Sequence, residues 1–153
     1  MNLSTAFPSL ASYFASSRIV GLYFASSWCP DCRPTTPMIK SVYESQNPTT
    51  PDDKKFEVVY VSSDRNEEEM MNYMSKSHGS WGFVPFHNEE RNNLKRKFGV
   101  CAGKELFELG LSSVERKFGI PTLILIDCKT EEVLTFNGLD DVADGTLLKK
   151  YNL

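Results

Sequence analysis

The chain contains 153 residues, of which 41% are hydrophobic and 24% charged, and its formal net charge is −3 at pH 7. This length and composition predict one soluble globular domain over residues 1–153. The negative charge, and basic runs no longer than residues 95–97, argue against nucleic acid as a partner. No apolar stretch approaches the roughly 18 residues of a membrane-spanning helix, and the N-terminus lacks the pattern of a signal peptide.

The first half of the chain predicts alternating helices and strands. Residues 3–16 are Ser-rich and indicate one or two helical turns. Residues 19–25 form an apolar run typical of a strand buried on both faces, and apolar residues at helical spacing predict a helix from about Pro30 to Gln46. Two prolines indicate a loop over residues 47–53, and residues 56–62 predict a second buried strand.

The second half continues this alternation. An acidic first turn favours a helix over residues 66–77, because acidic side chains stabilise the positive end of the helix dipole. Residues 79–88 indicate a loop whose aromatic side chains pack beneath it, and residues 89–98 another helix. His78 and His87 are interpreted as loop or surface residues. Two strands and a terminal helix complete the chain, at residues 122–127, 131–136 and 145–151. The order predicts an α/β fold, a mixed central sheet with helices on both faces.

Two of the four cysteines, Cys29 and Cys32, stand two residues apart, where the first strand ends and a helix begins. A helix N-terminus stabilises a thiolate through its free backbone N–H groups, and the thiolate is the form that attacks. Pro30 suits the first helical position, where its missing N–H costs no hydrogen bond. We therefore expect Cys29, at an exposed tip, to be the nucleophile and Cys32, one turn behind it, to be the resolving thiol.

The residues around this pair leave two questions open. Asp31 disfavours the Cys29 thiolate, whereas Arg33 and the helix dipole favour it, so the sign of the net pKa shift is undetermined. Zinc binding is an alternative use of a Cys-x-x-Cys pair, but zinc needs four ligands, and the remaining cysteines, Cys101 and Cys128, are 27 residues apart. We expect no metal and no bound cofactor.

A short internal repeat precedes the last strands, because residues 94–100 resemble residues 114–120 at an offset of 20 residues. We interpret residues 99–118 as an insertion in the loop region. Cys101, which lies within it, is interpreted as a spare cysteine, with a regulatory thiol as the alternative. Cys128 ends a strand and is interpreted as structural.

The string Tyr-Phe-Ala-Ser-Ser-Trp-Cys-Pro-Asp-Cys-Arg at residues 23–33 resembles the active-site pattern Tyr-Phe-x-x-x-Trp-Cys-Pro-x-Cys-Arg of thioredoxin-like proteins, and most closely that of tryparedoxins and nucleoredoxins. The similarity continues at residues 59–64, 81–86 and 119–123 and covers roughly residues 19–137. This resemblance implies a thioredoxin fold and a thiol–disulfide oxidoreductase that reduces protein disulfides.

The resemblance also implies roles for single residues. Trp28 would pack beside the cysteines and line the docking surface. Pro121 would be cis and would face Cys29, and the Ile120 backbone would be available to pair with an extended substrate. Tyr23 stands where many thioredoxins bury an acidic residue, and tyrosine is a poor base near pH 7.

The departures from the family pattern concern substrate choice and proton transfer. The base that deprotonates Cys32 is unassigned, with water and Asp64 as candidates. Asp31 replaces the proline common in tryparedoxins and matches a thioredoxin-related group of narrower substrate range, so it would restrict substrates. Pro37 would kink the active-site helix. The segment 99–118 would reshape the docking surface.

The resemblance implies partners and a location as well. Peroxiredoxin-type peroxidases are the expected electron acceptors, and a thioredoxin reductase or a low-molecular-weight dithiol would restore the reduced pair. We expect a cytoplasmic protein, with the nucleus as a second location, and no nucleic-acid or membrane partner. One alternative is a redox-responsive, nucleoredoxin-like binding module with little general reductase turnover, and a zinc-binding structural module is another.

Overall fold

The computed structural model describes residues 2–46 and 54–153, so the loop predicted over residues 47–53 lies outside the described residues. Within the described residues, one five-stranded sheet has the strand order β3-β2-β1-β4-β5. Strand β2 pairs in parallel with β1 and β3, whereas β4 is antiparallel to β1 and β5, so the sheet is mixed as predicted. The strands are β1 (Ser17–Ala25), β2 (Lys54–Ser62), β3 (Gly82–Phe83), β4 (Thr122–Asp127) and β5 (Val133–Thr135).

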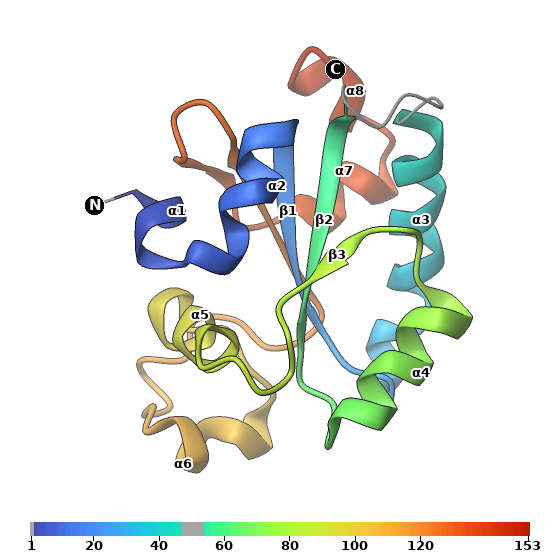
Figure 1. Ribbon diagram of the computed structural model, residues 1–153. Coiled ribbons are helices and arrows are strands. Elements are labelled where there is room, and N and C mark those ends of the chain that lie inside the picture. Colours follow the sequence, from blue (N-terminus) through green and yellow to red (C-terminus); the bar gives the residue numbers. More distant parts are fainter. Residues whose placement is uncertain (1, 47–53) are drawn as a thin grey trace.

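Helices cover both faces of this sheet (Figure 1). One face carries α1 (Leu3–Ala6), α2 (Ala11–Ser16) and α5 (Glu90–Phe98). The opposite face carries α3 (Thr35–Gln46), α4 (Glu67–Ser77), α7 (Gly138–Ala143) and α8 (Leu147–Lys150). A further short helix, α6 (Leu106–Leu109), lies beside α5. None of the described helices is long and apolar enough to cross a membrane.

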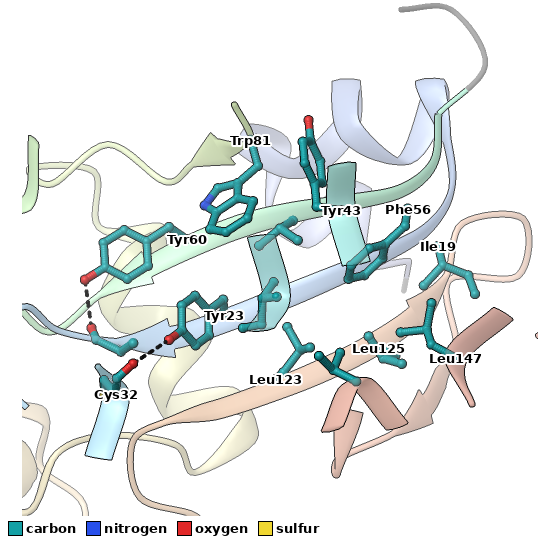
Figure 2. Close-up of a cluster of buried hydrophobic side chains, with 14 of the residues drawn as sticks. Ile19, Tyr23, Cys32, Tyr43, Phe56, Tyr60, Trp81, Leu123, Leu125 and Leu147 are labelled. Carbon is teal, nitrogen blue, oxygen red and sulfur yellow. Dashed lines mark hydrogen bonds between the residues drawn. The ribbon is translucent and has the colours of Figure 1, made fainter. Parts of the chain in front are cut away.

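Strand β1 is central and buried on both faces, as its apolar run predicted. Its side chains alternate between two hydrophobic clusters: Ile19 and Tyr23 belong to one, and Val20 and Leu22 to the other. Figure 2 shows the first cluster, in which Tyr23 lies next to Cys32. Because both clusters are built on β1, the segment that follows this strand is held against the core.

The predicted helix from Pro30 to Gln46 is interrupted. A 3-10 turn spans Pro30–Cys32, and α3 begins only at Thr35. The prolines at 34 and 37 lack the N–H groups that would join the two segments, and the Pro37 ring would clash with the carbonyl four residues earlier. Pro37 therefore lies in the first turn of α3, where a proline is tolerated, and the expected kink is replaced by a break before it.

Three other boundaries differ from the sequence prediction. The aromatic loop contains β3, which pairs two of its residues with β2. The strand predicted over residues 131–136 is shortened to β5. The terminal helix predicted over residues 145–151 is shortened to α8, and α7, which was not predicted, precedes it and is separated from it by Gly145 with a positive φ of 73°. Elements this short carry too few apolar repeats to show a period in the sequence.

The two ends of the segment 99–118 lie side by side and are joined by backbone hydrogen bonds. Val100 and Phe118 form a parallel bridge, and the backbone N–H groups of Lys117 and Phe118 donate to the Gly99 carbonyl at 2.7 and 3.1 Å. Gly99 ends α5 in the left-handed conformation, with φ 66°, which glycine adopts without steric cost. Between these ends lie a 3-10 turn at Gly103–Glu105 and helix α6.

Candidate active site

The two cysteines of the motif form a tight turn just after β1. The Cys32 N–H donates to the Cys29 carbonyl at 3.2 Å, and Pro30 occupies the first position of this 3-10 turn, as predicted. Both cysteines are free thiols. The spacing in the sequence therefore brings the two side chains together at the end of the central strand.

The burial of the pair corrects one expectation. Cys29 was predicted at an exposed tip, but only 5% of its surface is exposed, and Cys32 is fully buried. Both belong to the hydrophobic cluster against which Trp28 and Ile120 pack, because the turn follows directly on a strand that is buried on both faces. Cys29 is still the more accessible thiol of the two.

The Cys32 thiol is held in its protonated form. Burial raises its pKa well above the usual range, and a hydrogen bond with Cys29 and the charge of Asp31 raise it further, against an opposing hydrogen bond from the Ser26 backbone. A thiol that keeps its proton can donate to a neighbouring thiolate. The surroundings of Cys32 therefore keep this thiol protonated near neutral pH.

Tyr23 supports the backbone of the turn rather than the Cys32 thiol. Its hydroxyl lies 2.7 Å from the hydroxyl oxygens of both Thr35 and Thr36, and these threonines donate to the Cys32 carbonyl at 2.8 and 3.2 Å. Burial raises the pKa of Tyr23 well above its usual value. Tyr23 therefore stays protonated at neutral pH, and it contacts the Cys32 backbone carbonyl (Figure 2).

Asp64, one candidate base for Cys32, is occupied elsewhere in this structure. Its buried carboxylate accepts hydrogen bonds from the Ser27 N–H, the Tyr60 hydroxyl and the Ser62 hydroxyl, each at 2.7 Å. No hydrogen bond among the described residues joins it to the Cys32 thiol. Asp64 instead fixes the segment that leads from β1 into the turn.

Trp28 lies beside the cysteines, where the resemblance placed it. Its indole N–H donates to the Ser63 carbonyl at 2.9 Å, and the Lys104 ammonium lies 3.8 Å from the centre of the indole ring. No motif in the sequence indicated that Lys104 would lie here. The only related signal was the repeat that marked residues 99–118 as a separate segment.

The other motif residues surround the turn. The side chains of Asp31 and Arg33 are exposed, and neither takes part in an ion pair among the described residues. The Ile120–Pro121 peptide bond is cis, as predicted. Both residues line a cavity of about 310 Å³, together with Phe118 and other side chains from β4, from the segment that precedes α7 and from α7 itself.

His78 lies in the loop that follows α4, as expected, but it is buried there and is not a surface residue. Only 6% of its surface is exposed, its Nδ1 accepts a hydrogen bond from the Trp81 indole at 2.9 Å, and its Nε2 has no hydrogen-bond partner among the described residues. Burial lowers its pKa to about 4. His87 is exposed, as expected.

The two remaining cysteines lie in unreactive surroundings. Cys101 is fully buried, and burial raises its pKa. Cys128 is half-buried, and burial raises its pKa to about 12. Thiols that remain protonated are poor nucleophiles at neutral pH, which favours the spare and structural interpretations. In the described parts of the chain, no three His, Cys, Asp or Glu side chains gather as metal ligands.

A mixed sheet in this strand order, with a Cys-x-x-Cys turn after its central strand, defines a thioredoxin fold. The sequence model of the thioredoxin-like family matches residues 17–133, and the chain belongs to this family. A crystal structure of thioredoxin from Wuchereria bancrofti superposes with a TM-score of 0.66 and 35% identity, covering 94% of this chain and 83% of that one.

The sequence relatives include nucleoredoxins and tryparedoxins. Human nucleoredoxin is 33% identical over 135 residues, which are 88% of this chain and 26% of that protein. Tryparedoxin from Trypanosoma brucei brucei is 33% identical over 118 residues, which are 76% of this chain and 66% of that protein. The chain thus spans about a quarter of the length of the human and Xenopus laevis nucleoredoxins.

Proposed function

We propose that the protein is a thiol–disulfide oxidoreductase that reduces protein disulfides through Cys29 and Cys32. The observation that carries this proposal is the pairing of two free thiols in one turn, of which Cys29 is the more accessible and Cys32 is hydrogen-bonded to it. Such a pair performs thiol–disulfide exchange when one thiol attacks and the other resolves.

The exchange would proceed in two steps. The Cys29 thiolate attacks one sulfur of the substrate disulfide, so a mixed disulfide forms and the other substrate sulfur leaves as a thiolate, which takes a proton from water. Cys32 then loses its proton and attacks the Cys29 sulfur. This step forms the Cys29–Cys32 disulfide and releases the second substrate thiolate. Two electrons have then passed from Cys29 and Cys32 to the substrate. An external dithiol reduces the Cys29–Cys32 disulfide and so restores the two thiols.

The surrounding residues would bind the substrate and set its range. Trp28 would line the docking surface, Ile120 would offer its backbone to an extended substrate, and Pro121 would face Cys29. Asp31 would restrict the substrates and Arg33 would favour the thiolate. The proposed partners are peroxiredoxin-type peroxidases as acceptors and a thioredoxin reductase or small dithiol as donor, in the cytoplasm or nucleus.

The test is disulfide reduction of a generic protein substrate driven by dithiothreitol, with wild type, Cys29→Ser and Cys32→Ser in parallel. We expect turnover by wild type, loss of activity in Cys29→Ser, and a trapped mixed disulfide in Cys32→Ser that mass spectrometry can identify. Cys101→Ser serves as the matched control and should keep full activity. A wild type no faster than dithiothreitol alone would overturn the proposal of a general reductase.

A redox-responsive binding module is the second candidate function. Cys29 is only 5% exposed, which limits access by bulky disulfides, whereas Phe107 in the segment 99–118 is 98% exposed and available to a partner. If wild type cycles between dithiol and disulfide without reducing generic substrates, this candidate takes precedence. A partner whose affinity changes with the oxidation state of Cys29 and Cys32 would then be the expected finding.

A further inference from the structure

Two neighbouring residues, Lys104 and Glu105, connect the segment 99–118 to the active site. Lys104 contacts Trp28, and Glu105 contacts Ser63, the residue that holds the Trp28 indole. The segment therefore contacts Trp28 directly through Lys104 and indirectly through the Glu105–Ser63 hydrogen bond.

Glu105 anchors the segment in the protein interior. Its carboxylate accepts from the Lys95 ammonium at 2.6 Å, the Ser63 hydroxyl at 2.6 Å and the Ala102 N–H at 2.9 Å. Burial opposes ionisation of Glu105, but the attraction of Lys95 and these hydrogen bonds together lower its pKa. The Lys95 side chain is fully buried and that of Glu105 is 11% exposed, so the pair is largely shielded from solvent. The backbone at residue 105 is thereby fixed beside the end of β2.

This anchor positions Lys104 on Trp28. The Ser63 carbonyl accepts from the indole N–H at 2.9 Å, while the Lys104 ammonium lies over the ring at 3.8 Å from its centre. A cation over an indole face is attracted by the negative face of the ring. The indole is therefore held at its N–H edge by the core and covered on one face by a cation.

The charge of Lys104 is available to a ligand. Its side chain is exposed, and none of the ion pairs found among the described residues includes it. It lines a cavity of about 330 Å³ whose acidic neighbours are Asp64, Glu105 and Glu108. Asp64 and Glu105 already accept hydrogen bonds from other groups, and Glu108 is exposed to solvent.

We infer that Lys104 is a specificity-determining residue, which favours disulfide substrates carrying a carboxylate side chain next to the reactive cystine. This inference rests on the proposed function, because it concerns the substrate that reaches Cys29. A substrate approaching Cys29 passes Trp28, and on that side it meets the Lys104 ammonium rather than a bare indole face. Charges at the rim of an interface act mainly by attracting complementary partners and repelling like-charged ones.

The test uses three peptide disulfides that differ only in the residue beside one cysteine, which is Asp, Asn or Lys. We measure kcat/KM for each peptide at low ionic strength. Wild type should prefer Asp over Asn and Asn over Lys, by about two- to fivefold at each step, the range of a solvent-exposed charge pair. Lys104→Gln should abolish the preference, Lys104→Glu should reverse it, and Lys104→Arg should keep it.

The matched control is Lys117→Gln, which removes an exposed lysine of the same segment whose ammonium donates to the Val114 carbonyl. It should keep the wild-type preference, and added salt should reduce the preference in wild type. Equal preferences in wild type and Lys104→Gln would overturn the inference while leaving the reductase proposal intact. Absence of turnover by wild type with every peptide would overturn both.

Discussion

Two polar networks lie beside the Cys29–Cys32 turn, and they are built from different chemistry. On the α3 side, the Tyr23 hydroxyl joins those of Thr35 and Thr36 against the Cys32 carbonyl, and each of these groups is neutral near pH 7. The network on the side of the segment 99–118 is ionic. There Glu105 pairs with a fully buried lysine, Lys95, at 2.6 Å.

The difference concerns what remains after one partner is removed. A neutral hydroxyl network that loses one member loses about one hydrogen bond, because its other members keep partners. A buried ion pair that loses one member leaves a charge without compensation, and this costs far more than the pair itself contributes. The ionic network should therefore be the more sensitive of the two to substitution.

The largest expected effect is that of Glu105→Gln. This change leaves the Lys95 ammonium buried without its counter-charge, so we expect a loss of about 3–5 kcal/mol in the free energy of unfolding. Urea denaturation followed by circular dichroism measures it. Arg65→Gln is the control, because the Arg65–Glu69 pair is 3.9 Å long and Arg65 is 66% exposed, and it should cost less than about 1 kcal/mol. Similar losses in the two variants would show that the buried pair contributes no more to the free energy of unfolding than the exposed pair does.

The next effect concerns the neutral side, where His78 introduces a dependence on pH. Its ring centre lies 4.4 Å from that of Tyr60 and 4.6 Å from that of Tyr73, and burial lowers its pKa from 6.5 to about 4. The unfolded chain binds this proton more readily than the folded protein does. The contribution of neutral His78 to the free energy of unfolding is therefore complete above about pH 6.5. It is lost as the pH falls toward 4, by up to about 3 kcal/mol.

Urea denaturation of wild type and His78→Gln at several pH values between 7 and 4 tests this expectation. Glutamine keeps an acceptor for the Trp81 indole but does not titrate, so the variant should lose less stability over this range, and His87→Gln should follow wild type. Glu105 does not confound the result, because it is present in wild type and in both variants, so any loss of stability on its protonation is the same in each. Parallel curves for wild type and His78→Gln would contradict the assignment.

The two networks also differ in how far the sequence predicted them. The apolar run at residues 19–25 predicted strand β1, and the spacing of Cys29 and Cys32 predicted that the two thiols lie together, because both signals are local. The pair Lys95–Glu105 carries no such signal, since both residue types usually indicate a solvated surface. Glu105 also accepts a hydrogen bond from Ser63, which is 42 residues away in the chain. Only the folded arrangement brings these three side chains together.

Burial explains the errors in the site as well. The exposed tip expected for Cys29 was inferred from local spacing, and the loop or surface position expected for His78 was inferred from residue type and did not include its burial in that loop. Their exposure depends instead on how Trp28, Trp81 and Ile120 pack against the core. The strand β4 was predicted with its observed bounds, because its apolar run is continuous. Short elements such as α7 and β3 were missed because six and two residues show no period.

The smallest expected effect tests the neutral network directly. Tyr23→Phe removes the hydroxyl that lies 2.7 Å from both Thr35 and Thr36, but both threonines still donate to the Cys32 carbonyl. We expect a loss of about 1–2 kcal/mol in the free energy of unfolding, and Tyr73→Phe, which removes a single hydroxyl contact with Thr36, should lose about half as much. Disulfide-reduction rates should change little, because the Cys32 thiol itself has no hydrogen bond to Tyr23. A loss for Tyr23→Phe as large as that for Glu105→Gln would show that the neutral network is as sensitive as the ionic one, and the contrast between the two sides would fail.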